Sequence, residues 1–166
     1  MQYGVGSVTP EAVHSELAAR TDLRRATFRG HAVVSTPEVL AEEKRMLDFA
    51  RSGVGNVAPI RWDPHAFTRT WLNADQKAAV RHVLTTTDRV TAVRGGAGVG
   101  KTTLMAEAAE AISAAGLRVV AVAPTAAARD VLRADGFPEA QTVAHLLQSQ
   151  ATRESLRGQV LWVDEA

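Results

Sequence analysis

The segment that most constrains this chain runs from Gly95 to Thr102 and reads Gly-Gly-Ala-Gly-Val-Gly-Lys-Thr. It fits G-x-x-x-x-G-K-S/T in full, which is the pattern of a phosphate-binding loop. A glycine-rich backbone can wrap closely around a phosphate with its N–H groups facing inward, and a following helix N-terminus adds partial positive charge. Such a loop lies between a strand and a helix, so the segment calls for an α/β fold.

The residues on either side of the loop predict both elements. Arg89–Val93 reads as a short strand, and Lys101–Ala115 reads as a helix that ends at Gly116. Apolar residues recur on one face of that helix at helical spacing. They are Leu104, Ala108, Ala111, Ile112 and Ala115.

Strands and helices alternate through the rest of the second part of the chain. Asn73 is the predicted cap of one helix, and Leu117–Ala123 is apolar on both faces apart from Arg118, as in a covered parallel strand. Thr125 and Thr142 each begin a further helix. Val160–Val163 is the last predicted strand. This alternation predicts a parallel sheet with crossover helices.

The region before about Thr70 differs in pattern. Thr-Pro-Glu occurs at Thr9 and again at Thr36, and each copy places a capping threonine, a first-position proline and an acid at a helix start. We therefore expect a small, mainly helical segment over residues 1–70 and an ATPase-type domain over residues 71–166. The stretch from Arg51 to Phe67, which contains Gly53 and Pro59, reads as a connecting loop.

Composition excludes several classes of function. The 166 residues carry a net charge of +1, so no global field indicates a nucleic-acid or membrane partner. There is no cysteine, which excludes disulfide and thiolate chemistry and fits a reducing compartment. No signal peptide or membrane span is visible in the sequence, so we expect a cytoplasmic protein.

The phosphate loop assigns roles to a small set of residues. Lys101 is expected to reach the β- and γ-phosphates of ATP, and Thr102 to hold Mg²⁺ through its hydroxyl. Asp164 follows the last strand and is expected to hold the Mg²⁺ water shell, while Glu165 orients or deprotonates the attacking water. Without the loop, two acids at that place would more simply be solvated charges. The expected nucleotide-binding residues are Gln76, Gly95, Gly96, Ala97, Gly98, Val99, Gly100, Lys101, Thr102 and Thr103, and the expected catalytic residues are Lys101, Asp164 and Glu165.

The stretch from Trp71 to Val80 resembles the "LNxxQxxAV" Q-motif of superfamily 1B helicases. That group includes RecD-like helicases and the helicase halves of MobF-type conjugative relaxases. The resemblance implies that Gln76 reads the edge of adenine. A local explanation stays open, because Asn73 and Gln76 stand at the N-cap and third helical positions and may form a capping box.

Three later stretches continue the resemblance in order. Ala123-Pro124-Thr125 is similar to motif Ia, the stretch from Thr142 to Leu147 to a "TxxxLL" segment, and the stretch from Val163 to Ala166 to motif II. The resemblance implies that Pro124, Thr125, Thr142 and His145 contact single-stranded DNA. Helix capping explains the two threonines equally well.

Residues Ser35–Glu43 resemble the segment that precedes the helicase core in MobF-type relaxases, which favours the conjugative group. The resemblance implies a RecA-like P-loop sheet that is incomplete, since motif III would follow motif II. The strand of motif III would lie between Arg89–Val93 and Val160–Val163, so we expect an open slot there and marginal stability. We expect ATP binding without efficient turnover. Another P-loop enzyme, such as a small-molecule kinase or a partitioning-type ATPase, and a non-functional remnant remain the alternatives.

Overall fold

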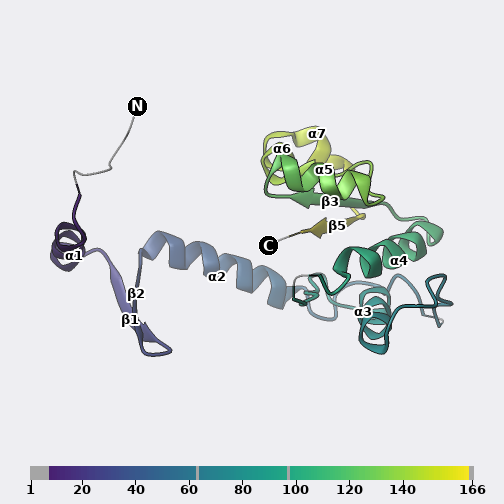
Figure 1. Ribbon diagram of the computed structural model, residues 1–166, viewed down its shortest axis with the longest axis horizontal. Helices are drawn as coiled ribbons and strands as arrows, with labels where there is room; N and C mark the ends of the chain where they lie inside the picture. The colour runs from purple at the N-terminus through teal and green to yellow at the C-terminus, as the bar shows by residue number, and fades with distance from the viewer. Residues whose placement is uncertain (1–7, 63, 97, 165–166) are drawn as a thin grey trace. The chain divides into compact units, whose positions relative to one another are not determined.

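The computed structural model describes residues 8–62, 64–96 and 98–164 of the chain (Figure 1). The chain divides into two compact units, the first ending at Gly53 and the second beginning at Val54. None of the helices in the described ranges is long and apolar enough to cross a membrane.

The first unit contains two helices and a hairpin. Helix α1 (Pro10–Ala19) is followed by strands β1 (Arg24–Phe28) and β2 (His31–Ser35) and by helix α2 (Pro37–Ser52). The hydroxyls of Thr9 and Thr36 accept hydrogen bonds from the N–H groups of Ala12 and Val39. Both helices thus begin where the Thr-Pro-Glu pattern predicts.

The first unit also contains a hairpin, which the expectation of a mainly helical segment did not include. Its strands pair antiparallel, with Phe28 opposite His31, and only Arg29 and Gly30 connect them. Both connecting residues have positive φ angles, 51° and 81°. Two left-handed residues in succession match the twist of the flanking strands, and glycine tolerates the second position without strain. The signal in the sequence was this glycine between two short runs that contain β-branched residues.

The second unit carries a small parallel sheet. Its elements in chain order are α3 (Ala74–Thr85), α4 (Lys101–Ala114), β3 (Val119–Ala123), α5 (Ala126–Ala134), β4 (Gln141–Thr142), α6 (Val143–Gln148), α7 (Gln150–Ser155) and β5 (Val160–Val163). The strand order is β4-β3-β5, and both pairings are parallel. In Figure 1, α5, α6 and α7 lie on one side of β3 and β5, and α4 lies on the other. This arrangement is consistent with part of a P-loop NTPase domain.

The expected strand at Arg89–Val93 is wrong. No strand forms there, although Val93 packs against the core. A strand exists only through hydrogen bonds to a neighbour, and β3 already pairs with β4 on one side and with β5 on the other. The expected slot between Arg89–Val93 and β5 is therefore not present as such, because Arg89–Val93 is not a strand. In the described sheet, β5 is an edge strand.

The core of the second unit joins the sheet to α3 and α4. Val80 and Leu84 of α3 meet Leu104 and Ile112 of α4, and all four side chains are buried. Ala121 and Ala123 of β3 belong to the same cluster. Four of the five residues predicted on the apolar face of α4 lie in this core, whereas Ala115 follows the end of the helix and is exposed.

The division between the units falls before the boundary expected near Thr70. The N–H of Val57 donates to the carbonyl of Thr87 and that of Arg61 to the carbonyl of Leu84, both at 2.9 Å. The N–H of Gly55 donates to the carboxylate of Asp88. These bonds attach the residues that follow Gly53 to the end of α3, so the connecting segment belongs to the second unit.

Candidate nucleotide-binding site

The N-terminus of α4 differs from the other helix starts in the part of the chain that the structure describes. Its N-cap is Gly100, which is left-handed and has no side chain that could cap the helix. The six other described helices each have a side-chain oxygen that accepts a hydrogen bond from the first turn. Uncapped N–H groups at a helix start, together with the helix dipole, favour an anion.

Lys101 lies folded over the phosphate loop. Its ammonium donates hydrogen bonds to the carbonyl oxygens of Gly95 and Gly96, at 3.0 and 2.9 Å. An ammonium group is a compact charge with three donors on a flexible stem. A phosphate in the loop would therefore compete with two neutral carbonyls for a cation that is already at the site.

The loop requires glycine at the positions where its backbone lies close to other side chains. Gly100 has φ +76°, and a Cβ there would lie 2.8 Å from Nε2 of Gln76. A Cβ on Gly95 would lie 2.8 Å from a methyl carbon of Val99. The loop folds tightly because these positions lack side chains, as a phosphate cradle requires.

Gln76 bonds to its own helix and to the phosphate loop. Its Oε1 accepts from the N–H of Asn73, while its N–H donates to Oδ1 of Asn73, both at 2.9 Å, so the capping box of α3 is complete. Its Nε2 donates to the carbonyl oxygen of Val99, also at 2.9 Å. The local capping explanation therefore holds, and the same side chain reaches the loop.

Residues of three parallel strands gather at one edge of the sheet. Pro124 and Thr125 follow β3, Thr142 ends β4 and Asp164 follows β5. The N–H of Asp164 donates to the carbonyl of Val122 at 2.9 Å, which fixes the start of the turn after β5. The carboxyl ends of parallel strands form the usual ligand-binding edge of an open α/β sheet.

The hydroxyls of Thr125 and Thr142 are helix caps. Each accepts a hydrogen bond at 3.1 Å, from the N–H of Ala128 and of His145 respectively. Pro124, Thr125 and His145 are exposed, and Thr142 is partly buried. Capping accounts for both threonine hydroxyls, and both residues lie at the carboxyl edge of the sheet.

The described contacts do not join every expected site residue. Ala97 and Glu165 lie outside the described residues. Among residues 8–62, 64–96 and 98–164, no hydrogen bond or ion pair connects Asp164 to the phosphate loop. The structure brings together Gln76, Val99, Gly100 and Lys101, and separately Thr125, Thr142 and Asp164.

Glu107 is a buried acid that the sequence patterns did not predict as part of a site. This acid lies on α4 and is only 1% exposed. Burial alone would raise its pKa, but hydrogen bonds from His65, Thr68 and Arg69 outweigh burial and lower the pKa to about 2. The available signal was an acid at a core position of α4, three residues after Leu104 and next to Ala108.

Comparison with known proteins gives a family match for the second part of the chain. The model of the family described as the AAA domain matches residues 71–166, more than half of the chain. A search of curated proteins found no match. The match begins at the first residue of the segment that resembles the Q-motif, and it covers the phosphate loop, α4 and the whole sheet.

Proposed function

Because the chain belongs to the AAA-domain family of P-loop proteins, which includes RecD-like helicases, we propose that it is the ATP-binding part of an ATP-driven DNA helicase. AAA P-loop domains generally bind ATP with Mg²⁺. The observation that carries the proposal is the start of α4. An uncapped helix N-terminus, a glycine cradle and the ammonium of Lys101 lie at one place.

The residues at the start of α4 suit a nucleoside triphosphate. The N–H groups after Gly98 would bind the β-phosphate, and Lys101 would exchange its two carbonyl partners for phosphate oxygens. Gln76 has one further N–H and one further lone pair beyond its present bonds, so its amide can read the adenine edge from beside the loop.

The residues that would hold Mg²⁺ are Thr102 and Asp164. A hydroxyl and a carboxylate are hard oxygen donors, which is the chemistry that Mg²⁺ accepts alongside phosphate oxygens and water. When bound, the ion would neutralise charge on the phosphates. Glu165 is the proposed group that takes a proton from the attacking water.

Single-stranded DNA is the proposed macromolecular partner, and the carboxyl edge of the sheet is the surface proposed to bind it. Pro124, Thr125, Thr142 and His145 lie at or just beyond the carboxyl ends of β3 and β4. The resemblance of Ser35–Glu43 to MobF-type relaxases narrows the proposal to a helicase of conjugative DNA transfer. Translocation requires two domains that close around ATP, so the chain is proposed as one partner in that motion.

Calorimetric titration with ATP tests the nucleotide-binding proposal. We expect saturable binding of ATP that strengthens when Mg²⁺ is added, because Thr102 and Asp164 then contribute through the metal. Absence of binding in both conditions would overturn the proposal.

The DNA proposal needs a separate measurement. We expect a fluorescent oligothymidine to bind the intact chain with an association constant whose logarithm falls linearly with the logarithm of salt concentration, since phosphate contacts release counterions. An affinity for oligothymidine that does not change with salt concentration, or no binding at low salt, would favour another class of P-loop enzyme.

A further inference from the structure

The segment His65–Arg69 lies before the family match, yet it is tied to the helix that carries the phosphate loop. We propose that Glu107 is a positioning residue for base recognition, because it fixes this segment and thereby sets Gln76 against the loop. This inference rests on the proposed nucleotide-binding function. Hereafter residues 65–69 are called the strap.

Among the described residues, the strap supplies the hydrogen bonds that the carboxylate of Glu107 accepts. One carboxylate oxygen, Oε1, accepts from Nε2 of His65 and from the N–H of Thr68, both at 2.8 Å. The other, Oε2, accepts from the hydroxyl of Thr68 at 2.8 Å, and from the N–H and Nη1 of Arg69 at 3.0 and 3.1 Å. A buried carboxylate is tolerated only when its lone pairs are satisfied, so the strap and Glu107 depend on one another.

Glu110 strengthens the same attachment from the next turn of α4. Its Oε1 accepts from Nη2 of Arg69 at 2.6 Å, while its side chain remains half exposed. The guanidinium of Arg69 therefore spans both carboxylates, one per nitrogen. This geometry fixes the direction of the strap along α4 as well as its distance from it.

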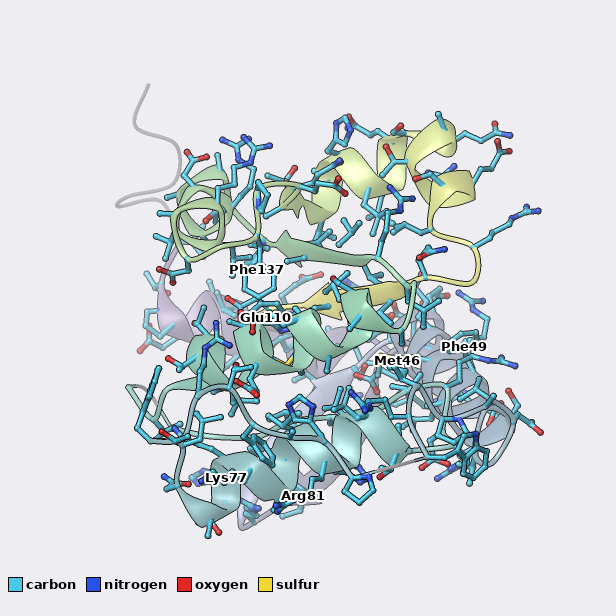
Figure 2. All side chains as sticks on the ribbon, turned by 90° about the vertical axis from the view of Figure 1, so that its right-hand side faces the viewer. Met46, Phe49, Lys77, Arg81, Glu110 and Phe137 are labelled. Atoms are coloured by element: carbon cyan, nitrogen blue, oxygen red, sulfur yellow. The ribbon has the colours of Figure 1, made fainter. Side chains whose placement is uncertain are left out.

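Helix α3 holds the opposite side of the strap. The charged groups of Lys77 and Arg81 lie 5.7 and 4.9 Å from the centre of the Phe67 ring. Lys77 also donates to the carbonyl of Thr70 at 3.0 Å. Figure 2 shows Lys77 and Arg81 along α3, with Glu110 on α4 above them. The strap thus connects the two helices that carry Gln76 and Lys101.

The connection from the strap to Gln76 is short and ordered. The N–H of Leu72 donates to the carbonyl of Arg69 in a turn, and the side chain of Leu72 is buried. Asn73 follows and caps α3 together with Gln76. A shift of the strap would therefore move the start of α3, and with it the contact of Gln76 with Val99.

This arrangement separates two parts of nucleotide recognition. The loop and Lys101 bind phosphates through α4 itself, whereas the position of the adenine-reading amide depends on the strap. Disturbing Glu107 should therefore weaken discrimination between bases more than it weakens the binding of phosphates.

The test compares ATP, GTP and inorganic tripolyphosphate by calorimetry, each with Mg²⁺, on the full chain. Glu107→Gln keeps the size of the side chain but turns an amide donor toward the donors of the strap. We expect the preference for ATP over GTP to fall by about tenfold, the equivalent of one well-placed hydrogen bond. Affinity for tripolyphosphate should stay near that of the unmodified chain.

The matched control is Glu139→Gln, which removes one exposed carboxylate that pairs with Nη1 of Arg118 at 3.8 Å. It should leave the preference for ATP unchanged. If Glu107→Gln does not fold, Thr68→Val removes a single donor from the cluster and should lower the same preference by a smaller factor in a folded protein.

The outcomes separate the inference from the function on which it rests. Failure of the unmodified chain to bind any of the three ligands would overturn the proposed function. If the unmodified chain prefers ATP and neither Glu107→Gln nor Thr68→Val changes that preference, only the role of Glu107 is overturned. An equal loss for all three ligands would also overturn that role, because it would mean that Glu107 serves stability alone.

Discussion

Helices α3 and α4 pack against each other but begin in opposite ways. The start of α3 is closed, since Asn73 and Gln76 exchange hydrogen bonds in a complete capping box. The start of α4 is open, since Gly100 offers no side chain and Lys101 turns back onto the loop carbonyls. A helix end that the chain satisfies itself contributes stability, whereas an end left unsatisfied gains most from a ligand.

Removing Lys101 should give the largest effect, and that effect should be on ATP binding and not on stability. We expect Lys101→Ala to abolish measurable ATP binding, because charge-assisted bonds to phosphate are lost where the helix end cannot replace them. The melting temperature should change little, since the described bonds of the ammonium are to two neutral carbonyls of the loop. Lys44→Ala, at an exposed lysine of α2 that pairs with Asp48, is the control and should bind ATP normally.

Acid should give the next largest effect, because it weakens the attachment of the strap to Glu107 on α4. The pKa of Glu107 is lowered from 4.5 to about 2, so its contribution is complete above pH 4.5 and is lost as the pH falls toward 2. The shift corresponds to a free energy on the order of 3 kcal/mol. Urea unfolding between pH 6 and pH 3 should show the unmodified chain losing its advantage over Glu107→Gln. An advantage that does not change with pH would show that the charge of Glu107 is not what stabilises the strap.

Gly100→Ala should disturb both helix starts at once. A Cβ at this position meets Nε2 of Gln76 at 2.8 Å, and φ is +76°. The left-handed angle alone costs alanine about 1–2 kcal/mol. Gly116→Ala is a matched control, because φ there is +82° and a Cβ meets no other atom within 4 Å. We expect similar losses in the free energy of unfolding from the angle, with weaker ATP binding only for Gly100→Ala.

The features that the sequence could predict are those that depend on residues close together in the chain. The phosphate loop, the apolar face of α4 and the caps at Thr9, Thr36 and Thr125 depend on neighbours a few residues away, so short patterns predicted them. The strand at Arg89–Val93 failed because a strand depends on a distant partner, which β3 does not provide. The cluster at Glu107 was missed for the same reason, since its donors lie 38 to 42 residues earlier in the chain.

Asn73→Ala should give the smallest effect and is the sharpest test of the comparison. The substitution removes the acceptor for the N–H of Gln76, but the N–H of residue 73 can still donate to Oε1 of Gln76. We expect a loss of about 1 kcal/mol in the free energy of unfolding, as is usual for a lost N-cap, and nearly unchanged ATP affinity. Thr125→Ala removes a cap of the same kind from α5 and calibrates the loss of stability. If Asn73→Ala instead weakened ATP binding while stability stayed constant, the capping residue of α3 would itself serve the ligand, and the contrast between a closed and an open helix end would fail.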